Sequence, residues 1–233
     1  MPETFAHSAT LESPSGARLS LFTEPGAGPV RGVIVINHGL AEHARRYARF
    51  AKVLARHGYH VYAHDHRGHG LTTAPGISLG QFAASDGWQR VVDDVLYVRK
   101  IAQANHPGLP LALFGHSMGG LIAMNAALRD NQGLDALAVW NSNFSAGLLG
   151  RLAQVILAVE KMLLGSDVPS MVLPKLTFQD WAAKIPDART KSDWLSRDPV
   201  EVDTYLADPL CGWDASVSMW QDIFRMIFAG ADN

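Results

Sequence analysis

The sequence predicts an α/β protein whose mostly parallel, doubly wound sheet carries an inserted helical cap. Between residues 33 and 140, short apolar strands alternate with segments of helical periodicity, as they do where helices cover both faces of a parallel sheet. After residue 144 the strand pattern stops and helical spacing remains. The 233 residues, 48% hydrophobic and 18% charged, suit one globular domain with an insertion.

The first 140 residues predict the strands and helices of the sheet. Residues 3–24 are expected to form an antiparallel hairpin around a turn that contains proline and glycine. Residues 33–36 are all β-branched, which suits a strand buried on both faces. A helix over 47–57 ends before Gly58, a residue suited to the left-handed turn after a helix. The later expected elements are, in order, a strand at 60–65, a helix at 88–104, a strand at 111–114, a helix at 118–129 and a strand at 136–140.

The segment after Phe144 predicts a cap made of helices, interrupted by prolines. We therefore divide the chain into the amino-terminal part of a core (1–143), a helical cap (144–214) and a helix that returns towards the core (215–233). The first cap helix repeats apolar side chains at helical spacing, and we expect them to pack in the core. These side chains are Leu152, Val155, Ile156, Val159 and Met162. The alternative is that they line an acyl-chain site or rest on a membrane surface.

Composition excludes several classes of partner. The chain has 20 basic and 22 acidic residues and no basic block, so no nucleic-acid partner is expected. Its single cysteine, Cys211, forms no internal disulfide and fits a reducing compartment. Residues 1–20 lack the pattern of a secretory signal, and charged residues interrupt the apolar stretch 148–164. We expect a cytoplasmic protein, with peripheral contact to a membrane as the alternative.

The run Gly115-His116-Ser117-Met118-Gly119 identifies a candidate nucleophile. A strand is expected directly before this run and a helix directly after Ser117, which is the arrangement of a nucleophile elbow. Gly115 and Gly119 leave space for the close approach of strand and helix. The alternative is a serine that caps a glycine-rich helix. The sequence therefore predicts Ser117 as the nucleophile of a serine hydrolase.

A second motif, His38-Gly39-Leu40, follows the strand at 33–36. Functional loops of parallel sheets gather at the carboxyl ends of their strands, so this loop is expected near Ser117. Acyl transfer requires hydrogen-bond donors directed at the developing oxyanion. The backbone amides of Met118 and Leu40 are the expected donors, with His38 and Gly39 supporting the loop.

Three segments together carry a family resemblance: Asn37 to His43 followed by Arg46-Tyr47, His64 to Gly70, and Gly115 to Gly120. With Ser196 to Pro199 and Ala207 to Leu210, they resemble the monoacylglycerol lipases and bacterial lysophospholipases of the serine aminopeptidase S33-like hydrolases. The resemblance implies an α/β-hydrolase fold, a serine triad and hydrolysis of a small acyl ester or lysolipid, without a cofactor. Thr72 departs from the family, where serine is common.

Two polar clusters have non-catalytic explanations. His64, His66 and His69 beside Asp65 resemble a zinc set, but Gly68 stands where metallo-hydrolases place an aspartate, so no metal site is expected. The preferred role is a loop that braces the oxyanion region, with Asp65 and Arg67 in a local polar network.

The second cluster is Glu42, His43 and Arg46, at the start of a predicted helix. Glu42 and Arg46 are four residues apart, so they stabilise the helix or, with His43, fix the loop that carries the Leu40 amide. Neither role makes them catalytic.

The acid and base of the triad are missing from this sequence. In this fold they follow the serine in the order Asp or Glu, then His, yet all ten histidines lie at or before His116. Asn141 and Asn143 occupy one loop where an acid is found in some hydrolases. His38 is expected behind the oxyanion loop and His116 on the buried side of the elbow. We therefore expect a truncated chain without the last two strands of the fold, nearly inert alone, whose strand at 136–140 is an unpaired apolar edge.

The predicted function is hydrolysis of lipid-like carboxylic esters through an acyl-enzyme on Ser117. The alternative is a hydrolase-like protein that binds an apolar ligand without turnover. Thioesterase and peptidase activity, acyl-chain length and oligomeric state stay open at the level of sequence.

Overall fold

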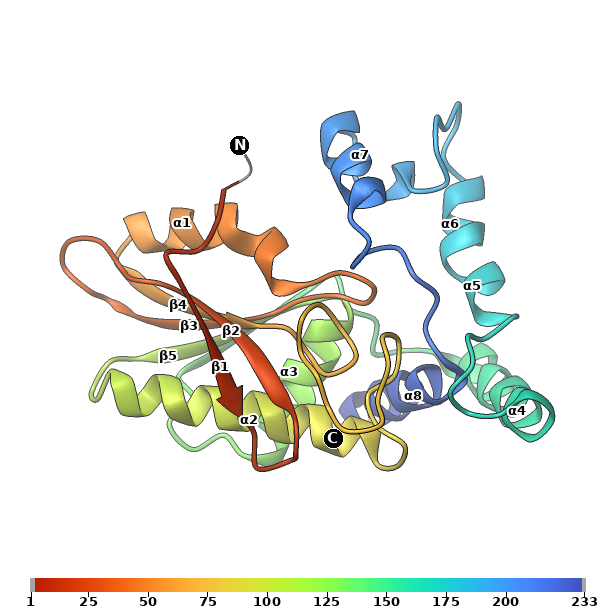
Figure 1. The fold of residues 1–233 in the computed structure, drawn as a ribbon, viewed down its shortest axis with the longest axis horizontal. Coiled ribbons are helices and arrows are strands. Elements are labelled where there is room, and N and C mark those ends of the chain that lie inside the picture. The colour runs from red at the N-terminus through yellow and green to blue at the C-terminus, as the bar shows by residue number, and fades with distance from the viewer. Residues whose placement is uncertain (1–2, 232–233) are drawn as a thin grey trace.

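The computed structural model describes residues 3–231 and has a mixed six-stranded sheet at its centre (Figure 1). The strands are β1 (His7–Glu12), β2 (Arg18–Glu24), β3 (Gly32–Asn37), β4 (Tyr59–His64), β5 (Leu111–His116) and β6 (Ala136–Trp140). Their order across the sheet is β1-β2-β4-β3-β5-β6. β1 and β2 form the predicted antiparallel hairpin, and β4, β3, β5 and β6 run parallel. The predicted α/β fold class is confirmed.

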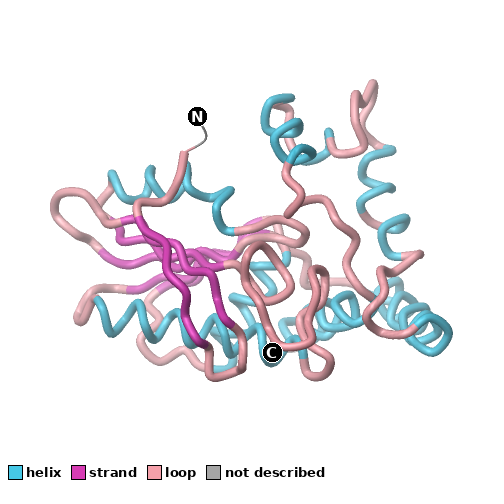
Figure 2. The backbone as a smooth tube through the Cα atoms, in the orientation of Figure 1, coloured by secondary structure: helices cyan, strands magenta, loops and turns pink. Residues whose placement is uncertain are grey.

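Helices cover both faces of the sheet, as Figure 2 shows for the backbone. One face packs against α1 (Ala48–Arg56), in a small core that includes Phe22 and Ile36. The opposite face carries α2 (Gly87–Asn105), α3 (Met118–Arg129) and α8 (Val217–Ala231), which contact one another over the larger core. β3 lies between these layers, which explains its β-branched sequence.

The register of the central strands places two loops together. Asn37 at the end of β3 pairs with Gly115 near the end of β5. The chain after β3 therefore emerges beside the turn between β5 and α3. This register positions the candidate site.

β6 forms one edge of the sheet and pairs with β5 alone among the described residues. Its outward side chains Ala136, Ala138 and Trp140 are exposed, and Trp140 is 66% exposed. The prediction of an apolar edge at 136–140 is confirmed for the described part of the chain.

The remaining helices lie between residues 147 and 207 and stand beside the sheet (Figure 1). They are α4 (Gly147–Leu164), α5 (Leu173–Leu176), α6 (Phe178–Ala183) and α7 (Pro199–Ala207), with a short 3₁₀ helix, η2, at Asp193–Leu195. A second 3₁₀ helix, η1 (Ala44–Tyr47), directly precedes α1. α4 packs on α8. The division into core, cap and return helix at 143/144 and 214/215 stays a prediction.

The expectation that the apolar stripe of α4 packs in the core is wrong. Leu152, Val155, Val159 and Met162 are 45–77% exposed, and Ile156 is half-buried. The buried side of α4 is made of Gly150, Ala153, Leu157 and Glu160 instead. Apolar residues occur on both sides of this helix, so periodicity did not identify the side that faces α8. Even so, none of the helices within residues 3–231 has the length and apolar character needed to cross a membrane.

Candidate active site

Ser117 lies at the turn between β5 and α3 in a strained backbone conformation. Its φ of 53° and ψ of −120° are rare for a residue with a side chain. The serine side chain makes no capping hydrogen bond to α3, which argues against a simple helix-capping role. The local geometry is that of a nucleophile elbow.

Two glycines allow this turn to close. A Cβ atom on Gly115 would lie 2.3 Å from the carbonyl oxygen of Gly119 and 2.5 Å from the Cα of Gly120. A Cβ on Gly119 would lie 2.1 Å from the carbonyl oxygen of Asn37. All three separations are shorter than atomic contacts allow, so strand, helix and the loop after β3 approach this closely only with glycine at both positions.

The backbone of Ser117 is held by residues at the end of β6. The amide of Ser117 donates to the carbonyl of Trp140 at 2.9 Å, and Ser142 Oγ donates to the carbonyl of Ser117 at 2.6 Å. Ser142 also fills the space opposite Gly120, where a Cβ would lie 2.0 Å from its Oγ. The sequence analysis missed Ser142, because a serine in a loop carries no signal of a contact made 25 residues away.

The loop after β3 is braced from behind by His38. The buried ring donates from Nδ1 to the carbonyl of Gly39 at 2.8 Å and accepts at Nε2 from the amide of His66 at 3.0 Å. Burial, together with the charge that His69 would carry, lowers the pKa of His38 well below its usual range. His38 is therefore neutral with both nitrogens occupied, and it is not available as a base for Ser117.

Glu42 closes the same loop from its other side. Its Oε1 accepts from the amide of Gly39 and from the hydroxyl of Tyr47, each at 2.7 Å, and Oε2 accepts from Arg46 at 3.3 Å. Burial opposes ionisation, but the hydrogen bonds from His116 and Tyr47 outweigh it and lower the pKa of Glu42 to about 2. A fixed carboxylate thus engages Gly39, next to Leu40. Glu42 lies before a 3₁₀ helix, not the predicted α-helix, and its partners are the Gly39 amide and two side chains of that 3₁₀ helix, Arg46 and Tyr47.

His116 is directed towards Glu42 and Tyr47. Since the Tyr47 hydroxyl donates to Glu42, His116 donates from Nδ1 to the Tyr47 oxygen at 2.8 Å. Its side chain is 35% exposed, so the expectation of a position on the buried side of the elbow is only partly met. Within residues 3–231, no histidine is hydrogen-bonded to Ser117.

His43 joins the loop to the segment after α7. Its Nε2 lies 2.8 Å from Oδ2 of Asp208. The carbonyl of Ala41 accepts from the amide of Gly212 in the same segment and from the hydroxyl of Tyr205 on α7, each at 3.0 Å. The sequence analysis places His43 in the loop after β3, but it does not identify Asp208 as the partner of His43, because the two residues lie 165 positions apart in the chain.

The loop after β4 takes part in two separate hydrogen-bond networks. Asp65 accepts from the amides of Ala44 and Leu71, each at 2.8 Å. Arg67 instead pairs with the buried Asp94 at 2.7 Å, on the side of the N-terminal hairpin. Asp65 and Arg67 therefore do not share the single local network that the sequence analysis predicts.

His64, His66 and His69 are all buried and pack as rings. The centroids of His64 and His66 lie 4.8 Å apart with the planes at 85°. His66 and His69 are 6.3 Å apart at 82°. The edge-to-face packing is that of a buried aromatic cluster.

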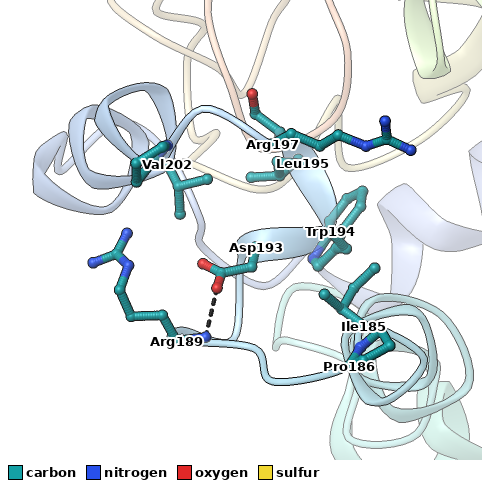
Figure 3. Close-up of a pocket in the computed structure, with 10 residues that line it drawn as sticks. Ile185, Pro186, Arg189, Asp193, Trp194, Leu195, Arg197 and Val202 are labelled. Atoms are coloured by element: carbon teal, nitrogen blue, oxygen red, sulfur yellow. Dashed lines mark hydrogen bonds between the residues drawn. The ribbon is translucent and has the colours of Figure 1, made fainter.

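One cavity of the described chain lies away from Ser117. It measures about 630 Å³ and is built from the segment between α6 and α7 (Figure 3). Its apolar lining includes Ile185, Trp194 and Val202, and Arg189 donates from its amide to Asp193 at its edge. None of the loop residues 38–43 or elbow residues 115–119 lines it.

Comparison with known proteins relates this geometry to one family. Residues 28–229 match the family described as serine aminopeptidase, S33. The chain is 35% identical to a monoacylglycerol lipase of Mycolicibacterium smegmatis over 180 residues, which are 77% of this chain and 56% of that protein. It is 34% identical to the monoglyceride lipase of Homo sapiens over 183 residues, which are 78% of this chain and 53% of that protein.

Solved structures share the fold. A thermostable carboxyl esterase from Bacillus coagulans, in complex with glycerol, superposes with a TM-score of 0.82 at 24% identity, over 95% of this chain and 72% of the other. A soluble variant of the Saccharomyces cerevisiae monoglyceride lipase gives 0.66 at 20% identity, over 98% of this chain and 68% of the other. The chain spans just over half the length of the two curated relatives. The strained elbow at Ser117, the adjoining loop and the match over residues 28–229 together show that the chain belongs to the serine aminopeptidase S33 family and has the α/β-hydrolase fold.

Proposed function

We propose that this chain provides the nucleophile of a serine hydrolase that acts on carboxylic esters of the monoacylglycerol or lysophospholipid type, through an acyl-enzyme on Ser117. The observation that carries the proposal is the backbone of Ser117, held at φ 53° between β5 and α3. A backbone conformation with this strain energy persists only where neighbouring residues fix it. At this turn it projects the serine oxygen away from the backbone.

The amides of Met118 and Leu40 are the proposed oxyanion donors. Met118 is the first residue of α3, where backbone N–H groups have no partner in a preceding turn. The amide of Gly39 is already bound to Glu42, which leaves Leu40 as the next amide of the loop. His38 and Glu42 hold this loop without touching Ser117, so we assign them, with His43 and Arg46, a positioning role.

The base that activates Ser117 is the group that the described residues do not supply. Loss of triad members costs about 10⁴- to 10⁶-fold in rate. We therefore expect the 233-residue chain by itself to hydrolyse esters about 10⁴- to 10⁶-fold more slowly than an enzyme with a complete triad, while the preorganised elbow still reacts with strong electrophiles.

Labelling and chemical rescue test this proposal together. A fluorophosphonate probe is expected to label the chain slowly, and Ser117→Ala is expected to abolish the label. Free imidazole, which supplies a base from solution, is expected to accelerate p-nitrophenyl ester turnover in the original chain and not in Ser117→Ala. Equal labelling of both proteins would reject Ser117 as the nucleophile, and ordinary turnover without imidazole would show that the chain contains its own base.

A second function, binding of an apolar ligand without turnover, is favoured by the missing base. It predicts that a non-hydrolysable ether analogue of monoacylglycerol binds while the fluorophosphonate leaves Ser117 unmodified. Labelling that depends on Ser117 contradicts it.

The outer side of α4 supports peripheral contact with an anionic membrane. Leu148, Leu149 and Leu163 are 70–88% exposed there. The only acid of this helix, Glu160, is buried and accepts from Ser170 Oγ at 2.6 Å and from two backbone amides. The helix therefore presents apolar side chains with exposed cations, Arg151 and Lys161, and no exposed acid.

Vesicle flotation tests this contact. Wild-type protein is expected to float with vesicles that contain phosphatidylglycerol, and Leu148→Asp with Leu149→Asp is expected to reduce the bound fraction at least about tenfold, because two leucines lose their burial in lipid. Val200→Asp is the matched control, since Val200 is 69% exposed on α7. Equal binding of the two variants would exclude α4 as the contact surface.

A further inference from the structure

A histidine, a carboxylate and a thiol from two distant segments meet beside the loop after β3. His43 lies just before η1, whereas Asp208 and Cys211 belong to the turn after α7. One ring nitrogen of His43, one carboxylate oxygen of Asp208 and the Sγ of Cys211 all lie within 4.8 Å of one another. None of these groups belongs to the elbow that carries Ser117.

Backbone contacts hold the three groups in place. Asp208 accepts from the amide of Leu210 at 2.9 Å through Oδ1, and its carbonyl accepts from the amide of Cys211 at 3.0 Å. Oδ2 of Asp208 lies 2.8 Å from Nε2 of His43. The turn is docked on the loop by the hydrogen bond from the Gly212 amide to the Ala41 carbonyl, and α7 by the bond from the Tyr205 hydroxyl to the same carbonyl. The nitrogen, oxygen and sulfur atoms of the three side chains are thus brought together by the fold and not by one flexible side chain.

Of the three groups, His43 is buried, whereas Asp208 and Cys211 are half-buried. His43 is 3% exposed, and its Nδ1 has no hydrogen-bond partner within the described residues. Burial, and the nearby charge of Asp208, raise the pKa of the Cys211 thiol to about 12. A strongly thiophilic ligand displaces the thiol proton when it binds.

We propose that His43, Asp208 and Cys211 form a binding site for a thiophilic divalent cation of the zinc type. Imidazole nitrogen, carboxylate oxygen and thiolate sulfur are the ligands that Zn²⁺ takes in proteins. Bonds of about 2.0–2.3 Å place tetrahedral ligands roughly 3.3–3.8 Å apart. The observed separations, from 2.8 Å to at most 4.8 Å, require shifts of about 1 Å in a turn and a loop. Three protein ligands leave a fourth position for water.

Arginines near the turn limit the affinity of this site. Arg45 and Arg46 act electrostatically on Cys211, whereas Asp208 and Glu42 act on it with the opposite sign. The bound cation replaces the thiol proton and adds one net charge beside these arginines. The site therefore selects ions that bind thiolate sulfur most strongly, such as Cd²⁺ and Zn²⁺, over Mg²⁺ or Ca²⁺.

Occupation of the site links the turn after α7 to the loop that carries Leu40. Without a cation the same region still joins the turn to the loop, since His43 and Asp208 are already hydrogen-bonded. The two roles differ in what they require of Cys211: cation binding uses its thiol, whereas the hydrogen bond between His43 and Asp208 does not.

Cadmium titration of the 233-residue protein tests the proposal. We expect one equivalent of Cd²⁺ to bind with a thiolate-to-cadmium charge-transfer band in the ultraviolet. The affinity is expected to rise about tenfold per pH unit between about pH 6.5 and 8, because binding releases one thiol proton. Cys211→Ser is expected to lose the band and to weaken binding about 100-fold, and Asp208→Asn to weaken it about tenfold.

His7→Gln is the matched control, because His7 is an exposed histidine on β1 outside the site. Its affinity is expected to match the original protein. Absence of the band, unchanged affinity in Cys211→Ser, or an affinity that stops rising above about pH 7, as histidine ligands alone predict, would overturn the proposal. Near-ultraviolet circular dichroism checks that each variant is folded. If Cys211→Ser does not fold, the affinity of Asp208→Asn decides the outcome. Fluorophosphonate labelling of Ser117 is read separately, so loss of the cation site leaves the hydrolase proposal standing.

Discussion

Ser117 shows how a single residue is held in a strained conformation. A left-handed backbone at a residue with a side chain costs on the order of 1–3 kcal/mol. Here Ser142 holds the Ser117 carbonyl, Trp140 accepts from the Ser117 amide, and glycines at 115 and 119 clear the space around the turn. The strain is therefore maintained by neighbours from β6 and from the loop after β3.

At this scale we predict that Gly119→Ala is strongly destabilising. Alanine ordinarily stabilises a helix by about 0.5–1 kcal/mol relative to glycine, but here its Cβ meets the backbone of Asn37 at 2.1 Å. We expect a loss of at least about 3 kcal/mol in the free energy of unfolding, measured by urea denaturation. Gly28→Ala is the control, because Gly28 has a φ of 66° in open space and costs about 1 kcal/mol through strain alone. Equal losses in the two variants would contradict the steric explanation.

At the scale of elements, the end of β4 and the loops after β3 and β4 are joined by buried imidazoles. His38 packs on His66 with ring centroids 4.4 Å apart and on His69 at 5.1 Å. Burial lowers the pKa of His64 and of His69 to about 4 and that of His38 and His66 well below the usual range. The cluster is stable only with neutral rings.

The histidine cluster predicts acid-sensitive stability. In the unfolded chain these histidines titrate near pH 6.5, so below that pH the unfolded state binds more protons and stability falls as the pH falls from about 6.5 to 4. His64 and His69 each contribute a loss of roughly 2 kcal/mol at pH 5. Asp222 opposes the trend, since burial raises its pKa to about 6 and protonation below that value favours the folded state.

Urea denaturation between pH 7 and pH 5 measures this dependence. His69→Gln is expected to reduce the slope of stability against pH, whereas His7→Gln, at an exposed site, leaves it unchanged. Stability that is the same at pH 7 and pH 5 would contradict the prediction.

At the scale of the whole molecule, two apolar surfaces lie open on the described chain. One is the outer side of α4, and the other is the β6 edge with its exposed Trp140. An unpaired strand presents a row of backbone donors and acceptors to other chains, and apolar side chains strengthen that contact. β6 also holds Ser117 through the Trp140 carbonyl, so association at this edge acts on the elbow directly.

The β6 edge predicts self-association that rises with concentration. Ala138→Lys, at an exposed position of β6, is expected to shift the protein towards monomer in sedimentation velocity, because a charged side chain opposes edge pairing. Ser8→Lys places the same charge on β1, the opposite edge of the sheet. A monomer at every concentration, or an equal effect of the two lysines, would exclude the β6 edge.

The sequence by itself determined the order and type of the main elements and the position of the candidate nucleophile. Strand periodicity, β-branched runs and glycines at the elbow are local signals, and the structure confirms the fold that they predict. The absence of any histidine after residue 116 is also a fact of sequence.

Only the tertiary structure decided which side of α4 is buried, that His116 is directed towards Tyr47, and that His43 meets Asp208. α4 is apolar on more than one side, so its packing depends on α8, and the contact between His43 and Asp208 spans 165 residues. Such contacts are set by the register of β3 against β5 and by the docking of the turn after α7 on Ala41, and neither leaves a periodic signal in the chain.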